Sequence, residues 1–302
     1  MVMKNAKTVN YWQVDNRKPS IKEEKGLVIL PSGVGFEKYE WVRKYFDKKP
    51  EGGYFVWIRK SIKATAKVCL TIENIGVKQN LENLIVVEEG VKAKLNGSCF
   101  VCKKNLKSEH VGKTQVVLGV RSKLIIEHYH RWGGEDRVKM FTKVNVGQGA
   151  ECEIKYKCLE PAKIFEKTNQ VRVEDGGKVR IETKLVAENS DANLIESVDL
   201  MGDNSEAVVR LRLVGKKGGR IKARSTMTGK KKSSGHVDCM GLVVDKRAEI
   251  EVVPSLKITD DLTSLTHEAA VGRISKKKLE YLRSKGLSEN EAIDLIIGGF
   301  LE

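Results

Sequence analysis

The sequence lacks a long hydrophobic run. No segment of its 302 residues approaches the roughly 20 consecutive apolar residues that a membrane-spanning helix requires. The first residues, Met1 to Asn5, also lack the apolar stretch of a secretory signal peptide. With only six cysteines, the chain has too few for the disulfide framework of a secreted domain, so free thiols in a reducing compartment are expected. These absences predict a cytoplasmic protein with no membrane segment.

Motifs of nucleotide-binding and hydrolytic enzymes are absent as well. The sequence contains no G-x-x-x-x-G-K-[ST] phosphate loop, no G-x-S-x-G nucleophile turn and no G-x-G-x-x-G after a strand. If the function uses ATP, another protein must bind the nucleotide. The sequence therefore predicts a protein that is not an enzyme in the ordinary sense.

Positive charge is in excess. Lysine and arginine outnumber aspartate and glutamate by 55 to 40, which gives a formal net charge of +15. Part of this excess lies in a basic stripe at 206–238, which has no acidic residue between Glu206 and Asp238 and contains Arg210, Arg212, Lys216, Lys217, Arg220, Lys222, Arg224, Lys230, Lys231 and Lys232. Such a stripe can bind phosphates, so a basic nucleic-acid-binding protein is the alternative hypothesis. Many of these residues alternate with apolar ones, as outward strand positions do, which favours a solvated face.

The spacing of apolar residues divides the chain into three regions. Residues 1–53 are mixed, with one amphipathic helix predicted near 35–48. Over 54–262 polar and apolar residues alternate, as in half-buried strands, with breaks containing Gly or Asn between them at fairly regular distances. This pattern predicts a long all-β domain and allows a sandwich, a barrel or a β-solenoid.

Residues 263–302 end in two predicted helices. Ser275 can cap the first, which carries Leu279 and Leu282 on one face. Ser288 opens a capping box before the second, whose apolar stripe consists of Ala292, Leu295, Ile296 and Phe300. The stripe packs either against the β domain or against a partner subunit, and the sequence favours neither.

Cysteine and histidine supply the candidates for metal chemistry. Cys99 and Cys102 form a C-x-x-C pair, but on a strand their side chains point to opposite faces. A zinc site would have to recruit His110, His128 or His130, whose spacings fit no familiar pattern. His128 and His130 fall on one strand face, a spacing compatible with one metal ion. Exposed or hydrogen-bonded histidines are nevertheless the favoured interpretation.

The remaining cysteines give weaker signals. Cys152 and Cys158 lie on the apolar register of a strand and are predicted to be core residues, because unpaired cysteine is among the most buried residue types. Cys69 stays unassigned.

The order of motifs over 235–302 is more specific. It runs through GHVDCMGL at 235–242, PSLKI at 254–258, THEAAVGRI at 266–274 and YLRSKGL at 281–287. This order resembles the C-terminal part of the SufB/SufD family, the scaffolds on which iron–sulfur clusters are assembled. Upstream of 235 the similarity is one of pattern and length only.

The resemblance implies a fold and a set of ligands. The fold is a right-handed parallel β-helix core with a small mixed N-terminal region and a C-terminal helical pair. Cys239 matches the Cys that holds the nascent cluster in the SufB branch, although Asp238 takes this place if the alignment shifts by one residue. His267 and Glu268 match the His-Glu step of SufB, and His267 alone matches the His-Gly-Ala step of SufD. Because adjacent strand residues face opposite ways, these two would serve one iron only from different subunits.

The resemblance also implies partners. In the family an ABC-type ATPase, SufC, docks on the C-terminal helical region, and SufB pairs with SufD through the β cores. This chain carries features of both, which predicts a homodimer through the β-helix core. A sulfur donor and apo iron–sulfur proteins are further expected partners, and a flavin is a possible cofactor that the sequence does not predict. The residues expected to bind the ATPase are Leu279, Leu282, Leu295, Ile296 and Phe300.

The predicted function is therefore a scaffold subunit that builds a transient iron–sulfur cluster together with a SufC-like ATPase. The nucleic-acid alternative is weakened by Glu289, Glu291 and Asp294, which would bring negative charge to phosphate. A β-solenoid enzyme acting on acidic polymers is a third hypothesis, and the sequence lacks an evident carboxylate cluster on one strand face.

Overall fold

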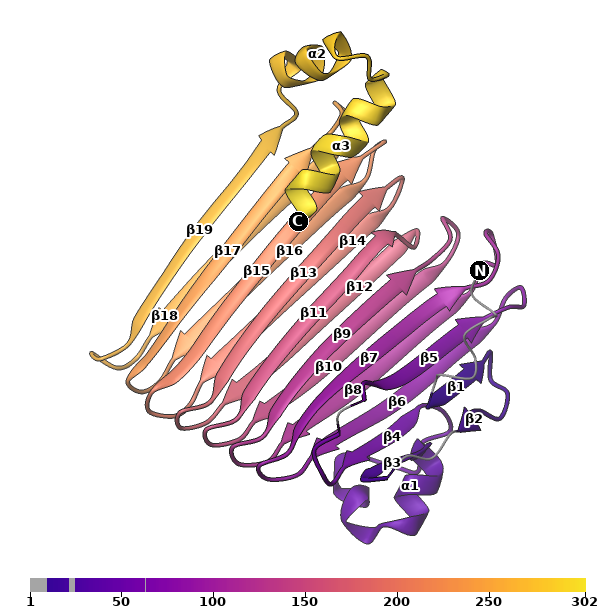
Figure 1. Ribbon diagram of the computed structural model, residues 1–302, viewed down its shortest axis with the longest axis vertical. Helices are drawn as coiled ribbons and strands as arrows, with labels where there is room; N and C mark the ends of the chain where they lie inside the picture. The colour runs from indigo at the N-terminus through magenta and orange to yellow at the C-terminus, as the bar shows by residue number, and fades with distance from the viewer. Residues whose placement is uncertain (1–9, 22–24, 63) are drawn as a thin grey trace.

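The computed structural model describes residues 10–21, 25–62 and 64–302. The expectation for Met1 to Asn5 lies outside these residues. Strands make up 57% of the structure and helices 12%, so the molecule is mainly β. Figure 1 shows the strands as one long array that ends in two helices. No helix in the described part of the chain has the length and apolar character needed to cross a membrane.

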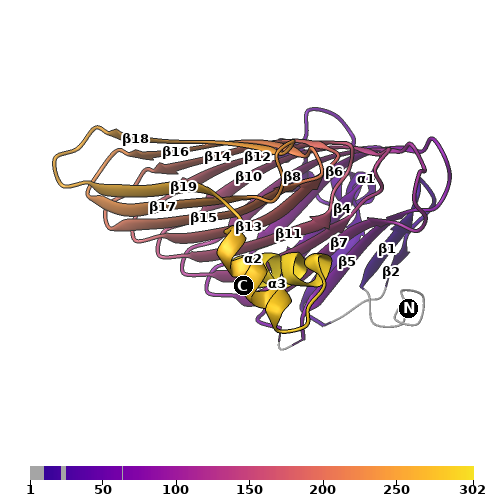
Figure 2. The same ribbon diagram turned by 90° about the horizontal axis from the view of Figure 1, so that it is seen from above.

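The strands form two facing sheets, and from β4 onward the chain passes alternately between them (Figure 2). Sheet A has ten strands in the order β19 (Ser264–Arg273), β17 (Ser233–Val243), β15 (Ser205–Lys216), β13 (Lys178–Glu188), β11 (Glu151–Glu160), β9 (Lys123–Arg131), β7 (Lys92–Val101), β5 (Ala66–Ile72), β1 (Tyr11–Val14) and β2 (Ser20–Ile21). Sheet B has nine strands in the order β18 (Glu249–Ile258), β16 (Arg220–Gly229), β14 (Asp191–Leu200), β12 (Ile164–Val173), β10 (Arg137–Val146), β8 (Glu109–Leu118), β6 (Lys78–Val87), β4 (Tyr54–Ile58) and β3 (Leu27–Pro31).

This arrangement is a β-solenoid of about eight turns with parallel sheets. Each coil stacks on the preceding one in register, so a residue lies beside its counterpart one coil earlier. The ion pairs Lys123–Glu151 and Lys178–Glu206 both join residues 28 positions apart on neighbouring coils. The predicted mainly β fold, with a parallel solenoid core and a C-terminal helical pair, is confirmed.

Alternation along each strand sends every second side chain into the space between the sheets. These inward residues form one continuous hydrophobic core that runs from Tyr11 on the second strand from the edge of sheet A to Leu265 on β19. The turns between strands also stack. A Cβ at Gly202 would lie 2.0 Å from the backbone nitrogen of Asp175 one coil earlier, so this turn requires glycine.

The N-terminal end is covered by short helices rather than by the single helix predicted near 35–48. Helix α1 (Ser32–Lys38) and the 3-10 helix η2 (Glu40–Tyr45) are separated at Tyr39, whose backbone is extended. The break lets the rings of Tyr39 and Trp41 both pack against Trp57 on the outer face of β4. An uninterrupted helix would turn these two aromatic residues away from each other, and this packing explains why the single-helix prediction was wrong.

The C-terminal end is open. Among the described residues, no further coil stacks on the edge strands β18 and β19; the residues of β19 are mostly exposed, and those of β18 are exposed or half-buried. Apolar side chains that would face the core in a longer solenoid remain in solvent here, as at Ile258, 52% exposed, and Val271, 45% exposed. Strand β19 still belongs to sheet A as far as Arg273, after which the chain leaves the solenoid for helices α2 (Lys276–Ser284) and α3 (Glu289–Leu301).

Candidate functional site

Cys239 lies one strand from the open end of sheet A. On β17 it pairs with Leu211 of β15 and with Ala269 of β19, and it faces the interior. Its side chain is fully buried, and the Ser225 hydroxyl of the opposite sheet lies 3.8 Å from its sulfur. Burial raises the pKa of the Cys239 thiol to about 11, so the free side chain is protonated at neutral pH.

His267 and Glu268 occupy the edge strand β19 and are exposed. His267 pairs with Val237, which faces the core, so it lies on the inward side of the sheet, as Cys239 does. Glu268 pairs with Asp238 on the outer face, and its carboxylate lies 3.7 Å from the imidazole of His236. The structure therefore puts Cys239 and His267 on one side of the sheet and Glu268 on the other.

Asp238 is held on the outer face by two arginines. Arg212 donates two hydrogen bonds of 2.7 Å to its carboxylate, and Arg210 donates one of 3.1 Å. The hydrogen bonds from Arg212 contribute most to lowering the pKa of the Asp238 carboxyl. A carboxylate that already accepts three hydrogen bonds from two arginines has few lone pairs left to bind a metal ion.

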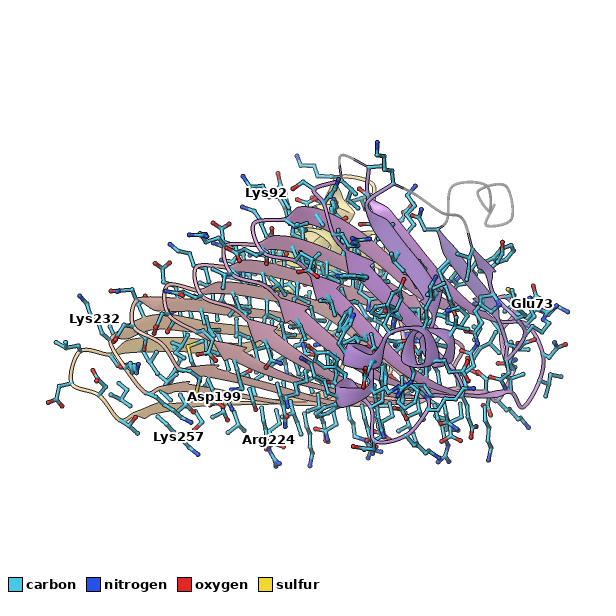
Figure 3. The ribbon with its side chains drawn as sticks, turned by 90° about the horizontal axis from the view of Figure 1, so that it is seen from below. Glu73, Lys92, Asp199, Arg224, Lys232 and Lys257 are labelled. Carbon is cyan, nitrogen blue, oxygen red and sulfur yellow. The ribbon has the colours of Figure 1, made fainter. Side chains whose placement is uncertain are left out.

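Other charges of the stripe at 206–238 are also paired. Lys217 binds Glu188 and Arg220 binds Asp191, in each case on a neighbouring coil. Arg224 projects from the outer face of sheet B (Figure 3). The stripe is divided between the outer faces of both sheets and is partly neutralised, which gives the nucleic-acid hypothesis no support.

A second group of metal-ligating side chains lies in the N-terminal half. Cys99 on β7 and His128 and His130 on β9 place their ligand atoms within 4.8 Å of one another. The sulfur of Cys99 lies 3.4 Å from Nε2 of His128, and the Nε2 atoms of the two histidines are 3.0 Å apart. Stacking of adjacent coils brings the cysteine to the histidines. Cys102, its partner in the C-x-x-C motif, is exposed and does not join the group.

Aromatic side chains surround His130. The Trp132 indole N–H donates to Nδ1 of His130 at 3.3 Å, and the Tyr156 hydroxyl lies 2.9 Å from the same nitrogen. Since an indole can only donate, Nδ1 accepts, and the proton of the neutral ring is on Nε2. His130 Nε2 therefore donates to Nε2 of His128.

Burial shifts the protonation of these groups. Loss of solvation lowers the pKa of His128 to about 4 and that of His110 to about 3, and it lowers the pKa of His130 well below its usual value. The same effect raises the pKa of the Cys99 thiol well above its usual value. At neutral pH the imidazoles of His110, His128 and His130 are therefore uncharged, and each ring keeps one nitrogen lone pair.

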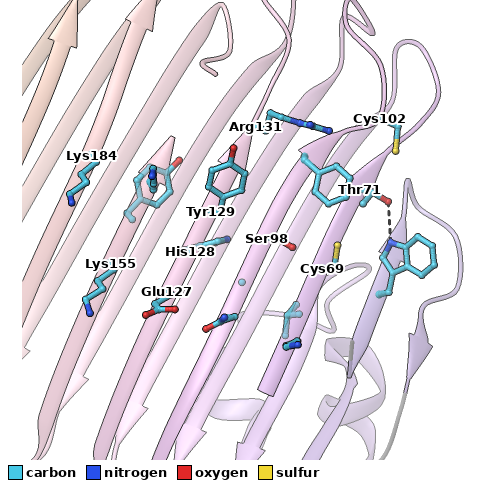
Figure 4. Close-up of a pocket in the computed structure, with 18 of the residues that line it drawn as sticks. Cys69, Thr71, Ser98, Cys102, Glu127, His128, Tyr129, Arg131, Lys155 and Lys184 are labelled. Carbon is cyan, nitrogen blue, oxygen red and sulfur yellow. Dashed lines mark hydrogen bonds between the residues drawn. The ribbon is translucent and has the colours of Figure 1, made fainter. Parts of the chain in front are cut away.

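A groove of about 1010 Å³ on the outer face of sheet A leads toward this group (Figure 4). Its walls come from β5, β7, β9, β11 and β13, with aromatic side chains such as Tyr129 and basic ones such as Arg131 and Lys155. Gly97 and the inward-facing His128 lie at its floor. A Cβ at Gly97 would come within 2.9 Å of the His128 ring, so the glycine leaves room for the imidazole beside it.

The interior also contains a charged pair that the sequence analysis missed. The Lys167 ammonium on β12 lies 2.5 Å from a carboxylate oxygen of Glu196 on β14, and both side chains are almost completely buried. The Thr183 hydroxyl contacts the same oxygen from sheet A. The second oxygen of Glu196 and the amide nitrogen of Asn169 are buried with no hydrogen-bond partner among the described residues. The sequence does contain a signal of this polar interior, because Lys167 and Asn169 interrupt the apolar register of their strand.

The C-terminal helix α3 packs on the outer face of sheet A. Ile297 and Leu301 are buried against a patch formed by Val186, Val214 and Leu242. Of the residues expected to bind a partner, Ile296 and Phe300 are half-buried against this patch, Leu279 and Leu282 on α2 are half-buried, and Leu295 is exposed. The capping box at Ser288 is present.

The prediction that Cys152 and Cys158 are core residues is confirmed. Cys152 and Cys158 are buried in the core, and all six cysteines are free thiols. Cys69, which the sequence left unassigned, lines the groove.

Comparison with known proteins defines the class of molecule to which this solenoid belongs. Residues 70–300 match the family model described as "SUF system FeS cluster assembly, SufBD core domain". The chain belongs to this family.

Curated relatives cover most of the chain. An "Iron-sulfur cluster assembly SufBD family protein" of Archaeoglobus fulgidus is 29% identical over 92% of this chain and 79% of its own length. A SufBD family protein of Methanothermobacter thermautotrophicus is 26% identical over 91% of this chain and 73% of its own length. One of Methanocaldococcus jannaschii is 29% identical over 78% of this chain and 75% of its own length. The chain is a SufBD family iron–sulfur cluster assembly protein.

The buried histidines predict acid sensitivity. His110 has a folded pKa of about 3 against an ordinary 6.5, so below pH 6.5 the unfolded chain binds a proton that the folded chain excludes. Stability from this group is complete above pH 6.5 and falls with pH toward 3, with a loss of about 2 kcal/mol at pH 5. His110→Gln should therefore reduce the difference in unfolding free energy between pH 7 and pH 5, measured by urea denaturation. His267→Gln on the exposed edge strand is the control, and an unchanged difference in His110→Gln would contradict the assignment.

Proposed function

We propose that this chain is the scaffold subunit of a SUF-type complex and that a transient iron–sulfur cluster is assembled as its cargo at the open end of the solenoid. The observation that carries the proposal is the position of Cys239, which faces the interior one strand from the uncovered edge. Membership of the SufBD family supports a role in cluster assembly. Six free thiols suit a reducing compartment, and we place the protein in the cytoplasm. The chain would act as a scaffold rather than as an enzyme.

Cys239 is the better candidate ligand of the two adjacent residues. Asp238 is on the outer face and is bound by Arg210 and Arg212, whereas Cys239 faces inward beside the open end. Thiolate, imidazole and carboxylate all bind iron, so His267 and Glu268 can complete a ligand set. Metal binding would require the Cys239 thiol to lose its proton, which the ion's charge favours.

Pairing of two chains through their open ends would resolve the opposed directions of His267 and Glu268. The unpaired edges of β18 and β19 and the exposed side chains of Ile258 and Val271 are surfaces that a second solenoid would cover. A twofold axis at this end would bring two copies of β19 together. One chain could then supply His267 and the other Glu268 to one site.

The C-terminal helices would dock a SufC-like ATPase. The chain carries no phosphate-binding loop of its own. Helix α2 and the outward side of α3 remain accessible, with Tyr281 61% and Leu295 57% exposed. A sulfur donor and apo iron–sulfur proteins are the remaining proposed partners, and no flavin is proposed.

The first test concerns the cluster. After anaerobic reconstitution with the ATPase, Cys239→Ser should lose bound iron and acid-labile sulfide, because a hydroxyl is a poor ligand for iron. Cys152→Ser, an equally buried thiol on the apolar register, is the matched control. His267→Ala and Glu268→Ala should lower cluster content more than His128→Ala and His130→Ala. Full cluster content in Cys239→Ser, with loss in a Cys99/Cys102 double variant, would move the site to the C-x-x-C segment.

The second test concerns pairing. Light scattering should give twice the mass of the chain at micromolar concentration. Val271→Lys places a charge among the uncovered apolar side chains of the open end and should shift the mass to that of a monomer without changing the circular dichroism spectrum. A monomeric wild-type protein, with and without the ATPase, would contradict the proposal.

The third test concerns docking. Leu295→Asp should abolish co-purification with the ATPase while leaving the fold intact, since this side chain makes no buried contact with the solenoid. Ile75→Asp, a similarly exposed apolar residue far along the chain, is the matched control. Removing residues 275–302 is a coarser experiment, because it uncovers Val186, Val214 and Leu242. Retention of the ATPase by both variants would show that docking occurs elsewhere.

A further inference from the structure

We propose that Cys99, His128 and His130 form a binding site for one divalent transition-metal ion of borderline softness, such as Zn²⁺ or Fe²⁺, inside the N-terminal half of the solenoid. The site is separate from the Cys239 end and does not depend on the cluster proposal. One thiolate and two imidazoles are a donor set that suits such ions.

Two distances between the donor atoms are close to those around one tetrahedral ion, and all three donors lie within 4.8 Å of one another. With metal–sulfur bonds of about 2.3 Å and metal–nitrogen bonds of about 2.05 Å, a tetrahedral angle separates sulfur from nitrogen by about 3.6 Å and two nitrogens by about 3.3 Å. The observed separations are 3.4 Å between Cys99 Sγ and His128 Nε2 and 3.0 Å between the two Nε2 atoms. Small side-chain movements would accommodate the ion.

Metal binding requires two changes of protonation. Cys99 must release its thiol proton to solvent. His130 must free Nε2 by carrying its proton on Nδ1, where the Tyr156 oxygen at 2.9 Å can accept a hydrogen bond. The Trp132 N–H, 3.3 Å from the same Nδ1, opposes this tautomer. Trp132 therefore acts as a positioning residue that weakens the site.

The outer groove lies next to the site. Gly97 and His128 line the groove, whereas Cys99 and His130 are buried. Three protein ligands leave the fourth position of a tetrahedron open. Water or an external thiol can fill it. A closed structural zinc site, by contrast, has four protein ligands.

Co²⁺ is the probe for the experiment. The metal-free, reduced full-length chain should bind one Co²⁺ and show a thiolate charge-transfer band in the near ultraviolet with tetrahedral d–d bands in the visible. Zn²⁺ should displace it. Cys99→Ala should remove the charge-transfer band, and His128→Gln should weaken binding beyond the roughly 10- to 100-fold loss typical of an outer partner.

Three controls locate the site. Cys152→Ala removes another buried thiol, Cys102→Ser removes the exposed thiol of the groove, and Cys239→Ser removes the proposed cluster ligand. All three should keep the band. If Cys99→Ala keeps it, or if only Cys102→Ser or Cys239→Ser loses it, the proposal is overturned. Circular dichroism of each variant separates loss of the ion from loss of the fold. His128→Gln alters a half-buried residue and gives a second measure of ion binding.

Trp132→Phe distinguishes a metal site from a hydrogen-bonded cluster. Loss of the indole N–H frees Nδ1 of His130 to carry a proton, so Co²⁺ should bind about tenfold more tightly. If the three residues serve only as a hydrogen-bonded core, wild type binds no Co²⁺ with a thiolate band and Trp132→Phe gains none. That result would refute the site.

Discussion

In-register stacking of coils is the constraint on which the rest of this molecule depends. Between the two ends, each strand pairs in parallel with the equivalent strand of the coils before and after it, so side chains at equivalent positions form rows along the solenoid. An apolar row makes a continuous core. A polar side chain in such a row has no water and must find its partners on adjacent coils or on the facing sheet. Both candidate metal sites and the buried Lys167–Glu196 pair are places where an inward row changes from apolar to polar.

The buried ion pair shows what such a change requires. Lys167 and Glu196 come from adjacent coils of sheet B, and Thr183 reaches the same carboxylate from sheet A. A buried pair of this kind contributes little net stability compared with apolar side chains, whereas loss of one partner costs about 3–5 kcal/mol. Such residues constrain the stacking of their coils more than they stabilise the fold. They also keep part of the interior polar between the N-terminal Cys/His group and the open end.

Alternation was enough to predict the strands, the core positions of Cys152 and Cys158, and the common face of His128 and His130. It could not bring Cys99 to those histidines, because that contact spans 29 residues and depends on the length of one coil. The alternation of polar and apolar residues does not reveal the coil length, because successive strands belong to two different sheets. The face of α3 was only partly predicted: Ile297 and Leu301, rather than Leu295, meet the solenoid, since the patch at Val186 and Val214 selects the face. The break at Tyr39 likewise follows from aromatic packing on β4, which helical spacing does not reveal.

The two ends of the solenoid differ, and the difference limits how copies of the chain can associate. At the N-terminal end the edge strands β2 and β3 pair antiparallel with their neighbours, and α1 and η2 cover the adjacent outer face. At the other end β18 and β19 keep the parallel pairing of the coils with their outer edges free. A solenoid with two equivalent ends would stack head to tail into a filament. This chain offers one such end, so the proposed pairing there would be isologous and would close at two copies.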